Sequence, residues 1–163
     1  MRRGRPDLPD SVLERLDIAI ASIHMPCFKD ERTIDNVTAA YEKVMEHPYV
    51  DIIGHPDDGR FPVDMKRLVK KAKETGTLLE VNNSSLRPEG FRENTKENCL
   101  EMVKECKAQG VMIVLGSDSH VDADIAEYPY AEEILRETDF PEELVANVSL
   151  EKLKACIKHG KKL

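Results

Sequence analysis

The chain of 163 residues has the length of a single domain, since globular domains mostly contain about 50 to 250 residues. Hydrophobic residues make up 40% and charged residues 34%, a balance that supports a buried core and excludes a disordered polymer. Twenty-four Lys and Arg against 31 Asp and Glu give a formal net charge of −7. This acidity argues against a broad surface for nucleic acid or for an anionic membrane, so we expect neither as a partner.

The expected location is the cytoplasm. The basic N-terminus is not followed by an apolar segment of signal-peptide length, and no stretch approaches the roughly 18 apolar residues that span a bilayer. The four cysteines form no Cys-x-x-Cys pair, and the sequence gives no reason to expect disulfides. Cys99 and Cys106 are seven residues apart in a helical segment, which predicts that both face the core.

Short apolar runs alternate with amphipathic segments along the whole chain, which is the pattern of an α/β fold. In chain order, it predicts a short helix from residue 9, a strand at 16–23, a helix at 33–46, a strand at 50–54, a helix at 64–75, a strand at 78–82, a helix at 95–109, a strand at 111–115, and helices at 130–137 and 149–159. Strands separated by long helices are expected to be parallel and to carry their chemistry at their carboxyl ends.

Three of the five histidines stand near those strand ends. His24, His55 and His120 each follow an apolar run, whereas His47 and His159 lie near helix C-termini, where a cation suits the helix dipole. A single histidine at a strand end is more typical of a hydrogen-bonded edge residue. Three in equivalent positions favour a shared site.

Asp118 stands two residues before His120. If strand geometry continues there, both side chains point to the same side of the sheet and can hold one ion or two neighbouring ions. Nitrogen and oxygen ligands suit Zn²⁺, Mn²⁺ or Fe²⁺, and residue type alone does not choose among them. Asp-x-His is a weak signal by itself. It gains weight from Gly116 and Ser117, small residues that let a ligand approach the backbone closely.

The third predicted strand ends in amides and hydroxyls. Asn82 and Asn83 are candidates for orienting metal ligands or water through hydrogen bonds, although a polar turn with Asx hydrogen bonds is the commoner role for either residue. Glu80 shares a strand face with Asn82. We expect its carboxylate to point into a polar interior beside the site, and not to solvent.

Two arginines in the loop after this strand, Arg87 and Arg92, are candidates for binding a substrate phosphate in bidentate fashion. Solvated loop arginines are the commoner case. The sequence contains no Gly-x-Ser-x-Gly elbow, no Walker A loop and no Gly-x-Gly-x-x-Gly fingerprint. These absences argue against serine hydrolases, P-loop enzymes and dinucleotide enzymes.

Four segments carry a family resemblance. In order, they are Ile-Ala-Ser-Ile-His at 20–24, Ile-Ile-Gly-His-Pro at 52–56, Leu-Glu-Val-Asn-Asn-Ser-Ser at 79–85 and Gly-Ser-Asp-Ser-His at 116–120. Together they resemble the C-terminal part of the PHP (polymerase and histidinol phosphatase) superfamily, in particular its stand-alone bacterial phosphatases.

The resemblance implies a distorted seven-stranded (βα) barrel with up to three divalent ions (Zn, Mn or Fe) at its mouth. It also implies the metal ligands, with His24 and His55 on one ion, Asp118 on another and His120 on a third. The implied activity is hydrolysis of a small phosphorylated substrate, a phosphomonoester, by metal-activated water without a covalent intermediate. No side chain is assigned as the catalytic group.

The family pattern is incomplete in this sequence. The superfamily opens with a His-x-His strand and continues with a bridging glutamate. Here no His-x-His occurs, and Glu14 falls in a predicted helix. We therefore expect residues 1–163 to form the C-terminal portion of such a domain, an incomplete barrel of about four parallel strands flanked by helices. Such a piece is expected to be weakly active or inactive alone.

Two other interpretations stay open. The chain can be a non-catalytic half-barrel that assembles with a second copy, or with a separate N-terminal half, through its open apolar edge. It can also be an unrelated α/β binding domain in which the histidines are scattered. Light scattering on the purified chain separates the first alternative, and the positions of the four candidate ligands separate the second.

Overall fold

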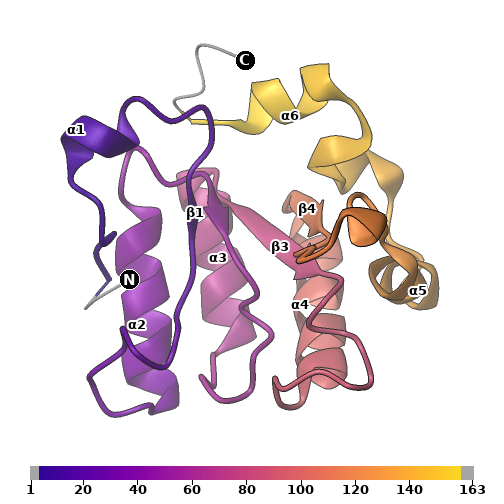
Figure 1. Cartoon of the computed structure of the whole chain (residues 1–163), viewed down its shortest axis with the longest axis horizontal. Helices are drawn as coiled ribbons and strands as arrows, with labels where there is room; N and C mark the ends of the chain where they lie inside the picture. The colour runs from indigo at the N-terminus through magenta and orange to yellow at the C-terminus, as the bar shows by residue number, and fades with distance from the viewer. Residues whose placement is uncertain (1–3, 159–163) are drawn as a thin grey trace.

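A parallel sheet lies at the centre of the molecule, seen in a computed structural model that describes residues 4–158 (Figure 1). The strands are β1 (Ile20–Ala21), β2 (Ile52–Ile53), β3 (Leu78–Asn82) and β4 (Ile113–Gly116). They pair in the order β1-β2-β3-β4, and every pairing is parallel. The predicted α/β class, with four parallel strands flanked by helices, is confirmed. The arrangement is consistent with an incomplete (βα) barrel.

Six α-helices and three short 3₁₀ segments connect and flank the strands in the part of the chain that the structure describes. They are α1 (Asp10–Leu13), α2 (Ile34–Met45), α3 (Met65–Thr75), α4 (Thr95–Gln109), η1 (Asp122–Asp124), α5 (Pro129–Glu137), η2 (Glu142–Leu144), η3 (Ala146–Val148) and α6 (Leu150–Cys156). Gly76 and Gly110 end α3 and α4 in the left-handed conformation, which glycine adopts without steric cost. The last helix was predicted to reach His159, which lies outside the described residues.

The first two strands are shorter than predicted. Strand pairing covers two residues of the 16–23 segment and two of the 50–54 segment. Directly before β1, a side chain replaces a partner strand as the acceptor: the N–H of Ala19 donates to Oδ2 of Asp51 at 2.9 Å. The apolar run therefore predicted the place of β1 correctly but overestimated its length.

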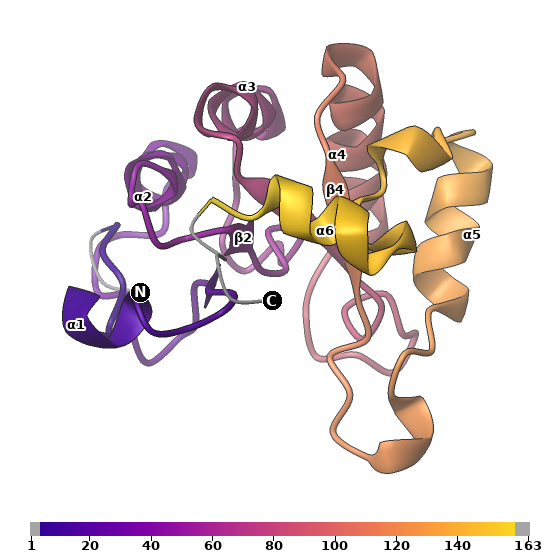
Figure 2. The ribbon, with the colours of Figure 1, turned by 90° about the horizontal axis from the view of Figure 1, so that it is seen from above.

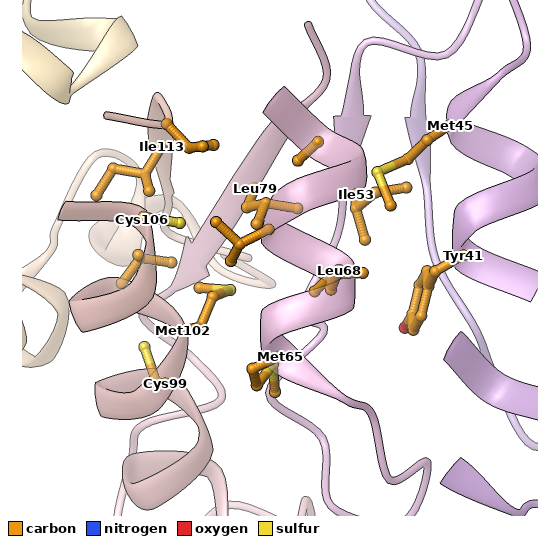
Figure 3. Close-up of a cluster of buried hydrophobic side chains, with 14 of the residues drawn as sticks. Tyr41, Met45, Ile53, Met65, Leu68, Leu79, Cys99, Met102, Cys106 and Ile113 are labelled. Atoms are coloured by element: carbon orange, nitrogen blue, oxygen red, sulfur yellow. The ribbon is translucent and has the colours of Figure 1, made fainter. Parts of the chain in front are cut away.

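One face of the sheet packs against α2, α3 and α4, which lie side by side along it (Figure 2). Ile53, Leu79 and Ile113 point from the strands into this core. The helices supply Tyr41, Met45, Met65, Leu68, Met102 and the two cysteines predicted to be buried, Cys99 and Cys106 (Figure 3). Burial raises the pKa of the Cys106 thiol to about 12, so this sulfur stays protonated and inert.

The opposite face of the sheet is covered only in part. Ile52, Leu78 and Val114 pack against Ala146 and Ile157, which flank α6, at the end of the sheet where the strands begin (Figure 1). The expected open apolar face is thus closed there. Toward β1 it stays open, since the side chain of Ile20 is 58% exposed.

The two edges of the sheet differ. Along β4, the side-chain amide of Asn147 accepts a hydrogen bond from Leu115 N–H and donates one to Leu115 C=O, both at 3.0 Å. The amide therefore bonds the N–H and C=O groups of Leu115 to which another strand could pair. Along β1, no strand of the described part of the chain pairs with the outer edge. None of the helices within residues 4–158 has the length and apolar character to cross a membrane.

Candidate functional site

The carboxyl edge of the sheet brings two of the predicted ligands together. The rings of His24, after β1, and His55, after β2, meet edge to face with their centroids 4.8 Å apart. His24 is exposed, and its Nε2 lies 2.8 Å from Oγ of Ser22. His55 is buried, and its Nδ1 has no hydrogen-bond partner. An unpartnered buried ring nitrogen is unusual, and here it is available to a ligand.

Both imidazoles are held in their neutral form. Burial, reinforced by the guanidinium of Arg92, lowers the pKa of His24 and brings the pKa of His55 to about 4. Metal ions bind the neutral ring, so neither histidine has to lose a proton before it can bind a cation at neutral pH.

Glu80 fixes the backbone that carries His55. The N–H of His55 donates to Oε2 of Glu80 at 2.8 Å, and Nδ2 of Asn82 donates to the same oxygen at 3.2 Å. The side chain is buried, as predicted, and burial raises its pKa. His55 itself has a positive φ of 35°, an uncommon conformation that the hydrogen bond to Glu80 helps to hold.

The glutamate fits because glycines stand beside it. A Cβ added to Gly116 would lie 2.0 Å from Oε1 and 2.8 Å from Cδ of Glu80. A Cβ added to Gly54 would lie 3.4 Å from Oε2. The glycines at the ends of β2 and β4 therefore leave room for a buried carboxylate in the middle of the candidate site.

This packing gives a first prediction. Gly116→Ala is expected to displace the Glu80 carboxylate and to destabilise the fold by about 1–3 kcal/mol, as overpacking does. In a Glu80→Ala background, the same alanine should cost much less, because the crowded group is gone. Urea unfolding of the two single variants and the double variant measures this coupling. Additive effects would show that Gly116 and Glu80 do not interact.

The strand geometry assumed for Asp118 and His120 does not continue beyond β4. Asp118 has a φ of 48°, so the chain turns left-handed directly after the strand. His120 is exposed, and its Nδ1 lies 3.0 Å from the backbone oxygen of Asp118. The condition under which both side chains would follow one strand face is therefore not met. The cause is the turn, which the Asp-x-His spacing did not reveal.

Arg92 occupies the space between the strand ends. Its side chain is 8% exposed and donates to Oδ2 of Asp118 at 3.1 Å, to Oδ1 of Asn82 at 3.2 Å and to Oγ of Ser85 at 2.6 Å. Its Nε, 4.0 Å from Oδ2 of Asp58, has no hydrogen bond. A buried guanidinium among these groups links the third and fourth strand ends into one polar cluster.

Arg87 and Asn83, the other two candidates among the polar residues after β3, stabilise loops. Arg87 pairs with Asp124 at 2.7 Å, and this pair joins the loop after β3 to η1. Oδ1 of Asn83 accepts hydrogen bonds from the N–H groups of Tyr130 and Ala131, and so caps the first turn of α5.

Asp57 is a feature that the sequence reasoning missed. Its carboxylate is fully buried, and neither oxygen has a hydrogen-bond partner. Burial raises its pKa to about 7. The adjacent Asp58 instead binds Arg60, with Nη2 and Oδ2 2.5 Å apart. The sequence signal that could have identified it is the pair Asp57–Asp58, which begins two residues after His55.

The nitrogen and oxygen atoms at this edge, including a buried nitrogen without a hydrogen-bond partner, are of the types that bind divalent metal ions. His24 and His55 are neutral and adjacent, and one of their nitrogens is buried without a partner. Asp118 provides an oxygen, which Arg92 holds. No group of three or more His, Cys, Asp or Glu side chains within residues 4–158 is arranged to bind a metal ion.

Comparison with known proteins adds independent information. No protein-family model matches the chain. Its sequence is 46% identical over 161 residues to a "Probable phosphatase" of Clostridium novyi, covering 99% of this chain and 65% of that protein. It is 42% identical over 158 residues to a "Probable phosphatase" of Acetivibrio thermocellus, covering 97% and 64%. A third, from Thermoanaerobacter sp., is 38% identical over 159 residues, covering 98% and 64%. The chain spans slightly less than two-thirds of the length of these relatives. The similarities support its assignment to a phosphatase family.

Proposed function

We propose that this chain carries part of the active site of a metal-dependent phosphatase of the PHP type, which hydrolyses small phosphomonoesters. The observation that carries the proposal is the His24–His55 pair, with ring centroids 4.8 Å apart at the carboxyl edge of a parallel sheet. Ligands bind at this edge in open α/β folds. The similarity to proteins named probable phosphatases supports the choice of reaction.

The proposed metal ligands are His24, His55, Asp118 and His120, for up to three ions of Zn, Mn or Fe. Bound there, divalent ions would neutralise phosphoryl oxygens and lower the pKa of a bound water. Glu80 holds the backbone of His55 in place by its 2.8 Å hydrogen bond. The histidines enter the reaction already neutral, so no proton must leave them before they bind a cation.

Arg92 is the proposed phosphate-binding residue. Its guanidinium is fixed beside Asp118, and it can exchange hydrogen bonds with Asn82 and Ser85 for hydrogen bonds to phosphoryl oxygens. Arg87, the other candidate, would first have to leave Asp124. Asn82 helps to orient the site through both Glu80 and Arg92.

The experiment is phosphate release from p-nitrophenyl phosphate with Mn²⁺. The sequence contains no His-x-His, so we expect the chain alone to turn over far below the roughly 10 s⁻¹ typical of enzymes. Arg92→Ala should reduce the residual rate further, whereas Arg136→Ala, on the exposed side of α5, should not. Absence of both metal-dependent release and phosphate binding would contradict the phosphatase proposal. A rate typical of enzymes would contradict the expected weakness.

One observation favours the second candidate function, a non-catalytic half-barrel that assembles with a second copy. The outer edge of β1 has no partner strand among the described residues, and Ile20, the first residue of β1, is 58% exposed. Such edges pair readily with other chains. Light scattering decides: a stable dimer that Ile20→Lys dissociates supports it, and a monomer at high concentration argues against it.

A further inference from the structure

Phe91 is the most exposed of the large apolar side chains in the described part of the molecule, at 75% exposure. It lies in the loop between β3 and α4, directly before Arg92, whose side chain is 8% exposed. Exposing a phenyl ring forgoes the free energy of its burial, which is large for aromatic side chains. Because the exposed ring lies against Arg92, a ligand bound at the polar cluster can reach it.

Two guanidinium groups contact this ring. Cζ of Arg60 lies 4.8 Å from the ring centroid and Cζ of Arg92 lies 5.5 Å from it, both within the range of a cation–π contact. Both cations are themselves fixed. Arg60 makes hydrogen bonds to both oxygens of Asp58, and Arg92 is bound to Asp118. The ring is thus held by two oriented cations and not by packing in a core.

We infer that Phe91, with Arg60 and Arg92, binds a planar aromatic group of the substrate, so that the preferred substrates are aromatic phosphomonoesters. The inference rests on the proposed function, since it takes Arg92 as the phosphate-binding residue. A phosphate at Arg92 places its ester group near the exposed ring, because the same guanidinium contacts that ring.

The chemistry of the surface favours an aromatic group over an aliphatic one. A planar group can stack on the exposed part of the phenyl ring, and it removes apolar surface of Phe91 from water. An aliphatic ester has no π-face and gains only the second of these. Aryl phosphates and nucleoside monophosphates both present such a planar group, and the experiment includes one of each.

The experiment measures binding by calorimetry, with Mn²⁺ present, for four probes: phenyl phosphate, adenosine 5′-monophosphate, glycerol 3-phosphate and inorganic phosphate. We expect the two aromatic esters to bind about fivefold more tightly than glycerol 3-phosphate. Phe91→Leu should abolish this preference and leave the affinity for inorganic phosphate unchanged. Phe91→Tyr should restore it. Leu150→Ala, at an exposed apolar position on α6, is the control.

The outcomes separate the two proposals. If Phe91→Leu weakens all four probes equally, the ring only supports Arg92, and the inference is wrong. If all esters bind the unaltered chain equally well, the inference is wrong and the phosphatase proposal stands. If only one aromatic ester is preferred, the substrate class narrows to it. If neither phosphate nor any ester binds, the proposed function fails, and the inference fails with it.

Discussion

Replacement of His55 by Asn is expected to lower the affinity of the chain for Mn²⁺ by at least about tenfold, the size of effect seen when the support of a metal site is lost. The substitution removes the unpartnered Nδ1 and the imidazole that meets the ring of His24 edge to face. Asparagine tolerates the positive φ of 35° at this position and keeps the N–H that donates to Glu80. The fold should therefore survive, and a calorimetric titration reports the loss directly.

The matched control is His47→Asn. This histidine lies after α2, where it contacts Asp10, and it has no part in the proposed site. It should bind Mn²⁺ as the unaltered chain does. Equal affinities for His55→Asn and the unaltered chain would remove His55 from the set of metal ligands.

The largest expected loss of stability follows from Asp51→Ala. This fully buried carboxylate accepts the N–H of Ala19 through Oδ2 and the N–H of Lys158 through Oδ1, both at 2.9 Å. It joins the start of β1 to the segment after α6. Alanine would leave two backbone donors without this acceptor, and a cost of about 3 kcal/mol is expected in urea unfolding.

Asp35→Ala is the control for removing a carboxylate from this protein. The Asp35 side chain is 90% exposed and pairs with Arg67 at the surface. Its loss should cost less than about 0.5 kcal/mol. If the Asp51 variant were equally mild, the buried carboxylate would not be holding the start of β1 to the segment after α6.

Periodicity and strand-end chemistry predicted much of the fold. Helices α3 and α4 begin and end within a residue of their predicted limits, because glycine caps and clear amphipathic spacing mark them. β1 was overestimated, because an apolar run does not show how many of its residues find a partner strand. Capping of the β4 edge by Asn147 has no sequence signal of its own, since it depends on a residue 32 positions away.

The site was predictable in part for a similar reason. Parallel topology was enough to bring His24 and His55 to one edge. The interior position of Glu80 followed from its strand phase. The buried contacts of Arg92, the turn at Asp118 and the unpartnered carboxylate of Asp57 arise from packing between loops, which residue spacing does not encode.

The most direct measurement is the position of zinc in crystals of the chain grown with Zn²⁺. An anomalous difference peak about 2.0–2.1 Å from a ring nitrogen of both His24 and His55 is the predicted result. Zinc bound only elsewhere, for example at His47, with the His24–His55 edge empty, would contradict a metal-dependent phosphatase site at this end of the sheet.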